Sequence, residues 1–232
     1  MTKMRLFCFP YGGAGASAFR TWGSVLPSWI EVAPVQVPGR ESRFREAPYT
    51  RVEPLVQDLI KAFDGVSGPF ALFGHSFGAL AAFEIARELR RRGRPAPKAF
   101  LVSGLPAPQL ERNRPKIAHL PKDELVRKLR DEFDLSPELL ELPEILDMVL
   151  PVMRADFEVV ETYDYREEPP LDLPIHPFGG QDDREAKADE LAAWNAQSTR
   201  PPVPVRLFPG DHFYLIKSRD ALLAAVAEAL KG

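Results

Sequence analysis

Short apolar runs alternate with longer helical runs along most of this chain, and this alternation restricts the fold more than any other feature. The apolar runs that read as strands are Met4–Phe9, Ile30–Val37, Phe70–Phe73, Ala99–Ser103, Leu173–Phe178 and Val203–Phe208. The helical runs between and after them are Ala18–Leu26, Val52–Phe63, Phe77–Arg92, Ala186–Ala196 and Arg219–Leu230. Strands that alternate with helices pair in parallel, so the pattern predicts an α/β fold with a mostly parallel central sheet flanked by helices.

The alternation stops between Pro106 and Tyr165, where the chain is polar and helical. Helices are predicted over Lys122–Phe133 and Pro143–Tyr163, the second kinked or broken at Pro151 because proline removes a helical hydrogen bond. We therefore predict a single domain over 1–232 with a helical insertion at about 106–165. Insertions of this kind often cover a site as lids, and a helical subdomain with no gating role is the alternative.

Composition excludes several classes of protein. The 232 residues carry a formal net charge of −3, whereas a nucleic-acid-binding domain is normally basic, so no nucleic-acid partner is expected. The one cysteine, Cys8, excludes an internal disulfide and a cysteine-rich zinc site, and it reads as core filler. No apolar run has the ~18–20 residues of a membrane span, and the Leu6–Phe9 run is too short for a signal-peptide core. We expect a cytoplasmic protein that does not bind a membrane.

The strongest chemical signal is the pentapeptide Gly74-His75-Ser76-Phe77-Gly78. A G-x-S-x-G string alone is weak evidence. Here it follows an apolar strand and opens a helix, which is the setting of a nucleophile elbow that projects the serine hydroxyl. Gly74 and Gly78 are then needed because side chains there would collide with the neighbouring strand and helix. The alternative is that Ser76 only caps the helix and the glycines only form a turn.

A serine nucleophile needs a base, and His212 is the best of four histidines. It follows the strand Val203–Phe208, at the sheet edge where parallel sheets bind ligands. His75 adjoins the serine and points away, His119 lies in the insertion, and His176 reads as a packed neutral imidazole within a strand. The acid that orients His212 is expected after Leu173–Phe178, where Asp182 and Asp183 both qualify by spacing.

Oxyanion donors are predicted at two backbone positions. One is the amide of Phe77, directly after the serine, and the other lies in the glycine-rich loop after the first strand, at Gly12 or Gly13. The same loop lacks the G-x-G-x-x-G spacing and has no P-loop lysine, so nucleotide binding is not expected. A cluster of arginines at the end of the Phe77–Arg92 helix is interpreted as a solvated face, with docking of an acidic partner as the alternative.

Taken together, the motifs resemble those of type II thioesterases that accompany polyketide and nonribosomal peptide synthetases, over nearly the whole chain. The shared segments are Phe9–Gly13, Trp22, Val37–Arg40 with Arg43, Phe73–Leu80 with Phe83 and Glu84, Val102–Gly104, Arg154–Phe157 with Tyr163, Gly179–Asp183 and Gly210–Leu215. The resemblance implies an α/β-hydrolase fold with a helical lid and a triad of Ser76, Asp183 and His212. The family places the acid three residues after the second glycine, hence Asp183. This chain departs from the family at Arg184, often proline, and at Gly12, often alanine.

The resemblance also implies a function: hydrolysis of stalled or incorrect acyl groups from the phosphopantetheine arm of acyl or peptidyl carrier proteins. No metal and no cofactor are implied, and we expect a monomer. A general esterase or a medium-chain fatty acyl thioesterase is the enzymatic alternative. A non-catalytic binding module is the third hypothesis, disfavoured by the order of serine, acid and histidine along the chain.

Overall fold

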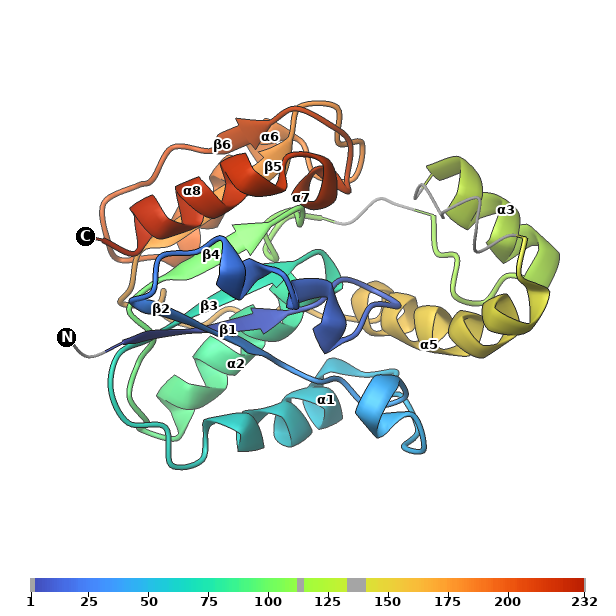
Figure 1. Cartoon of the computed structure of the whole chain (residues 1–232), viewed down its shortest axis with the longest axis horizontal. Coiled ribbons are helices and arrows are strands. Elements are labelled where there is room, and N and C mark those ends of the chain that lie inside the picture. Colours follow the sequence, from blue (N-terminus) through green and yellow to red (C-terminus); the bar gives the residue numbers. More distant parts are fainter. Residues whose placement is uncertain (1–2, 112–114, 133–140, 232) are drawn as a thin grey trace.

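A parallel sheet forms the centre of the protein in the computed structural model, which describes residues 3–111, 115–132 and 141–231. Within those residues the sheet has six strands in the order β2-β1-β3-β4-β5-β6, and each neighbouring pair is parallel. The strands are β1 (Met4–Phe9), β2 (Ile30–Pro34), β3 (Phe70–His75), β4 (Phe100–Ser103), β5 (Ile175–Gly180) and β6 (Arg206–Phe208). The predicted α/β architecture is confirmed (Figure 1).

The strand order changes direction at β1, which pairs with β2 on one side and with β3 on the other. Phe9 at the end of β1 is in register with Gly74 near the end of β3. The loops that follow these strands therefore leave the sheet next to each other. In parallel sheets such a switch point opens the crevice in which ligands bind.

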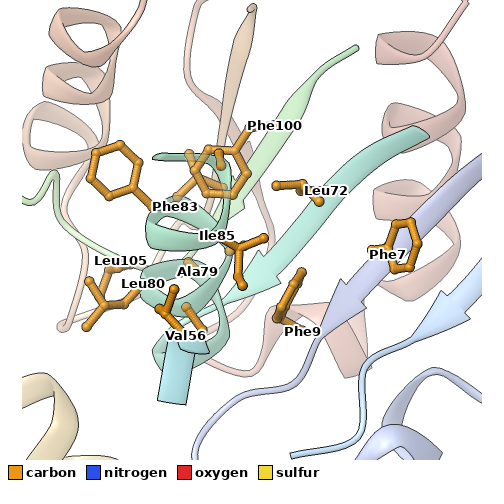
Figure 2. Close-up of a cluster of buried hydrophobic side chains, with 14 of the residues drawn as sticks. Phe7, Phe9, Val56, Leu72, Ala79, Leu80, Phe83, Ile85, Phe100 and Leu105 are labelled. Atoms are coloured by element: carbon orange, nitrogen blue, oxygen red, sulfur yellow. The ribbon is translucent and has the colours of Figure 1, made fainter. Parts of the chain in front are cut away.

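Helices cover both faces of the sheet. On one face α1 (Val52–Leu59) and α2 (Phe77–Arg91) bury a large apolar cluster, to which the strands contribute Phe7, Phe9, Leu72 and Phe100 (Figure 2). On the other face α8 (Arg219–Ala229) packs on a second cluster. The second cluster includes Cys8, which has no exposed surface, so its predicted core role is confirmed.

The segment between β4 and β5 contains α3 (Lys122–Glu132) and α5 (Pro143–Glu161), which extend beyond one end of the sheet (Figure 1). The two helices share a small apolar cluster of Ile117, Leu125, Leu129, Leu146 and Leu150. Of the predicted kink or break at Pro151, the break is wrong, because α5 runs continuously through this residue. Pro151 and Asp147 lie on the exposed side of the helix, so water can solvate the carbonyl that proline leaves without a donor.

Two predicted helices are shorter and tighter than expected. Ala18–Leu26 forms two 3₁₀ turns, Ala16–Phe19 and Trp22–Ser24, because Gly23 is a weak helix former. The Ala186–Ala196 helix consists of α6 (Ala188–Ala192) followed by a 3₁₀ turn. A further short helix, α7 (Tyr214–Lys217), precedes α8. Among the described helices, none has both the length and the apolar character of a membrane-crossing segment.

The arginine cluster at the end of α2 is largely paired within the chain. Arg87 is buried and contacts Glu84 and Glu168, and Arg91 bonds the same two carboxylates and Glu88. These ion pairs fix the segment around Glu168 against α2. The interpretation as a solvated face is wrong for Arg87, which is buried, and the pairing within the chain disfavours docking of an acidic partner.

Candidate active site

Ser76 occupies a strained turn between β3 and α2. Its backbone angles are φ +54° and ψ −120°, a left-handed conformation that side-chain-bearing residues rarely adopt. A Cβ on Gly74 would lie 2.3 Å from the Gly78 carbonyl oxygen, and a Cβ on Gly78 would lie 2.3 Å from that of Phe9. Both glycines are therefore required by close approach of backbone, as the sequence predicted, and the turn has the geometry of a nucleophile elbow.

His212 and Asp183 form a buried pair. His212 Nδ1 lies 2.9 Å from Asp183 Oδ2, and the Asp183 side chain has no exposed surface. Asp183 lies in the loop after β5, and backbone bonds from Gln181 to Phe208 and from Asp182 to Gly210 hold this loop beside the one that carries His212. Asp182 itself is exposed. Of the two acids that the sequence left open, Asp183 is the one that contacts the imidazole.

Ser76 and His212 line the same cavity, which has a volume of about 480 Å³. The loop after β1 contributes Tyr11 and Gly12 to its wall, and α2 contributes Phe77. The structure thus brings the predicted serine, histidine and two of the three predicted amide positions to one space at the carboxyl ends of the strands, and Asp183 lies behind His212.

One face of α5 forms much of the apolar wall of the cavity. Met153, Phe157 and Val160 line the cavity, together with Ile117 and Leu105. None of these side chains was predicted from the sequence to line a cavity. Their spacing along α5 places them on one helical face.

The Gly13 amide is engaged within the protein. It donates to Asp156 Oδ2 at 2.8 Å, whereas Gly12 and Phe77 both lie on the cavity wall. Phe77 is the first residue of α2, where backbone N–H groups have no intrahelical acceptor. This geometry removes Gly13 from the predicted set of oxyanion donors and leaves the amides of Phe77 and Gly12. Burial raises the pKa of Asp156, and Arg40 and the Gly13 amide oppose that shift.

His75 lies beside His212, with ring centroids 4.8 Å apart and the rings tilted by 45°. Its Nδ1 is 2.7 Å from the Ser103 hydroxyl, which in turn contacts the Tyr214 hydroxyl. Burial and the nearby His212 lower the pKa of His75 well below its usual value, so this imidazole is neutral at neutral pH. The sequence predicted only that His75 points away from Ser76. The hydrogen-bond network of His75 was not predicted, because its residues come from three segments that are distant in the sequence.

The other two histidines do not line the cavity. His176 is half-buried in β5, and burial lowers its pKa, which agrees with a packed neutral imidazole. Among the described residues no group of three histidine, cysteine, aspartate or glutamate side chains is arranged to hold a metal ion.

Comparison with known proteins gives one consistent family. A model described as "Thioesterase domain" matches residues 4–231. The gramicidin S biosynthesis protein GrsT of Aneurinibacillus migulanus is 38% identical, over 99% of this chain and 90% of that protein. The solved structure of RedJ, a thioesterase from the prodiginine pathway of Streptomyces coelicolor, has a TM-score of 0.90 at 41% identity and covers 97% of this chain and 85% of RedJ.

Two further relatives represent the two enzymatic alternatives. YbtT, the type II thioesterase of the yersiniabactin NRPS/PKS pathway, has a TM-score of 0.85 at 32% identity and covers 98% of this chain and 92% of YbtT. The medium-chain S-acyl fatty acid synthase thioesterase of Rattus norvegicus is 32% identical, over 92% of this chain and 82% of that protein. Identity to GrsT and RedJ, the proteins of gramicidin S and prodiginine biosynthesis, is higher than identity to the fatty acid enzyme, which equals that to YbtT.

Proposed function

Because this chain belongs to the thioesterase domain family, we propose that it hydrolyses stalled or aberrant acyl groups from the phosphopantetheine arm of carrier proteins in polyketide or nonribosomal peptide biosynthesis. The observation that carries the proposal is the cavity shared by Ser76 and His212, with Asp183 bonded to the far nitrogen of that imidazole. This arrangement has the parts of a serine hydrolase.

In the first step of the proposed mechanism the Ser76 oxygen attacks the thioester carbonyl while His212 takes the hydroxyl proton. Asp183 holds the imidazole in the tautomer that leaves Nε2 free to accept that proton, and its charge stabilises the imidazolium. The amides of Phe77 and Gly12 hold the developing oxyanion, each worth on the order of 100-fold in rate. The carbon–sulfur bond then breaks, and the pantetheine sulfur leaves with the proton from His212.

In the second step water replaces the thiol. His212 takes a proton from the water as its oxygen attacks the acyl carbon, and the ester bond to Ser76 breaks as His212 returns that proton to the serine oxygen. The products are a carboxylic acid and a carrier protein with a free thiol. Apart from the attacking water, this chemistry uses side chains and amides of the chain itself.

We propose that the segment at about 106–165 acts as the lid of this site. Lys116 and Ile117 precede α3, Met153 and Phe157 lie on α5, and all four line the cavity together with Ser76. The arm of a carrier protein would reach the serine between this segment and the strand ends. The apolar wall formed by Met153, Phe157 and Val160 would then contact the acyl chain.

A comparison of three substrates tests the proposal: one acyl group presented on a carrier protein, on coenzyme A and as an oxygen ester. The highest kcat/KM is expected for the carrier protein, and Ser76→Ala should abolish turnover of all three. A strong preference for the oxygen ester would instead support a general esterase, and equal rates on the carrier protein and on medium-chain acyl coenzyme A would support the fatty acyl alternative.

A further inference from the structure

A buried ion pair joins the α5 helix to the loop that follows β2. Both nitrogens of the Arg40 fork contact Asp156: Nη1 lies 2.6 Å from Oδ2, and Nη2 lies 2.7 Å from Oδ1. The two side chains are 6% and 2% exposed, so water screens the pair very little. Both residues lie in motifs that the sequence analysis singled out without giving them a role.

The same carboxylate also binds the loop after β1. Asp156 Oδ2 accepts the Gly13 amide at 2.8 Å, and Arg40 Nη1 donates to the Ala14 carbonyl at 3.1 Å. Gly13 has φ +79°, and a Cβ there would lie 2.6 Å from Cγ of Met153 on α5. The loop that carries the proposed oxyanion donor Gly12 is thus held from both sides by the pair and covered by α5.

Stability alone explains this pair poorly. Removing two charges from water carries a large desolvation cost, and a protein is often as stable or more stable with well-packed apolar residues of similar volume in place of a buried ion pair. A bidentate pair fixes the orientation of the carboxylate, because the carboxylate cannot rotate without breaking a charged hydrogen bond. Here the fixed orientation of the Asp156 carboxylate sets the position of the Gly13 amide, and Gly13 is adjacent to Gly12 on the cavity wall.

We propose that Asp156, held by Arg40, is a positioning residue that fixes the Gly12–Gly13 backbone so that the Gly12 amide is aimed at the oxyanion. The proposal rests on the serine mechanism above. It assigns Asp156 no contact with the reacting atoms, because its effect passes through Gly13 and the loop.

Two variants separate positioning from simple stability. Asp156→Asn keeps the size of the side chain but places an amide where both Arg40 nitrogens now find carboxylate oxygens. Its kcat should fall about 10- to 100-fold with KM changed by less than about threefold, because the lost interaction is made in the transition state. In the double variant Arg40→Met with Asp156→Leu, apolar side chains replace the charged pair. It should recover the stability lost in Asp156→Asn, but not kcat.

Glu84→Gln is the matched control. Glu84 also forms a buried pair with an arginine, at 2.7 Å from Arg87, yet neither residue lines the cavity. The Glu84→Gln substitution should lower the urea midpoint of unfolding without lowering kcat. Recovery of wild-type kcat in the double variant, or a kcat loss in Glu84→Gln equal to that in Asp156→Asn, would overturn the proposal.

The readouts distinguish failure of this proposal from failure of the proposed function. Turnover is measured on an acyl carrier protein and on a p-nitrophenyl ester. If the wild-type enzyme does not hydrolyse the thioester, the proposed function is contradicted. Hydrolysis of the p-nitrophenyl ester still measures oxyanion stabilisation in that case. Amide hydrogen exchange of residues 10–16 gives a readout that needs no activity. Exchange should be faster in Asp156→Asn than in the wild type and unchanged in Glu84→Gln; unchanged exchange in Asp156→Asn would contradict the proposed positioning role.

Discussion

Asp183 Oδ2 lies 2.9 Å from His212 Nδ1, and this contact joins the loops that follow two neighbouring strands, β5 and β6. Gly180, the last residue of β5, has no room for a Cβ, which would lie 2.3 Å from the Asp211 carbonyl oxygen. The acid and the base are therefore held together by backbone packing as well as by their own hydrogen bond.

Replacing Asp183 with asparagine should lower kcat by about 10⁴-fold, because an amide that donates to Nδ1 holds the imidazole in the wrong tautomer. The neighbouring exposed acid supplies the control, and Asp182→Asn should retain wild-type kcat. Steady-state kinetics of both variants check this. An equal loss in the two variants, or a loss in Asp182→Asn alone, would contradict the assignment of the acid.

Gly78→Ala should destabilise the fold by about 1–3 kcal/mol or more, since the new methyl group would overlap the Phe9 and Pro10 carbonyls. Gly23→Ala is the matched substitution: a Cβ at Gly23 meets no atom within 4 Å. Urea unfolding should show a lower midpoint for the first variant and an unchanged or slightly raised one for the second. Equal midpoints would show that the elbow tolerates a side chain at position 78.

His75 should make the stability of the protein depend on pH. Its folded-state pKa is lowered by burial and by His212, so below about pH 6.5 the unfolded chain binds a proton that the folded chain does not. The contribution to the free energy of unfolding is complete above that pH. It is lost as the pH falls further, by at most about 1.4 kcal/mol per pH unit.

Urea unfolding of the wild type and of His75→Asn between pH 7.5 and 5 measures this contribution. His176 also has a lowered pKa, but it is present in both proteins and cancels in the difference. The variant should lose less stability than the wild type on acidification. If the free energy of unfolding falls equally with pH in the two proteins, His75 accepts a proton in the folded state.

The face of α5 that lines the cavity should determine the selectivity of the enzyme for acyl-chain length. Val160→Phe should lower kcat/KM for long acyl chains more than for acetyl, because each methylene excluded from an apolar pocket is worth ~1–3 kcal/mol. Val149→Phe makes the same change on the same helix away from the cavity wall and should leave the chain-length profile unaltered. If both variants behave alike, this face of α5 does not contact the acyl chain.

Hydrophobic pattern was enough to predict the elements that position the site. β1 and α2 follow their apolar runs closely, and the need for glycine at 74 and 78 follows from packing a helix directly onto the strand before it. The sequence pattern could not distinguish Asp182 from Asp183, because the backbone conformation of the loop determines which of the two adjacent side chains faces His212.

Contacts made by the insertion were beyond what spacing could predict. The apolar pattern of the insertion left two roles open for its side chains between 139 and 149, lining an acyl pocket or packing on the sheet. In the structure Ile145 and Met148 are exposed, Leu146 packs against α3, and Leu139 and Leu140 lie outside the described residues. The pocket face lies farther along α5, at a rotation that depends on how the helix docks. The Arg40–Asp156 pair spans 116 positions and depends on the same docking.

Intact-mass analysis of the protein after brief exposure to an acyl carrier protein tests the central claim most directly. We predict an adduct equal to the mass of the acyl group on the wild-type chain, localised to the peptide that contains Ser76, and neither adduct nor turnover in Ser76→Ala. Wild-type rates of thioester hydrolysis in Ser76→Ala, or an adduct that persists on that variant, would contradict the account.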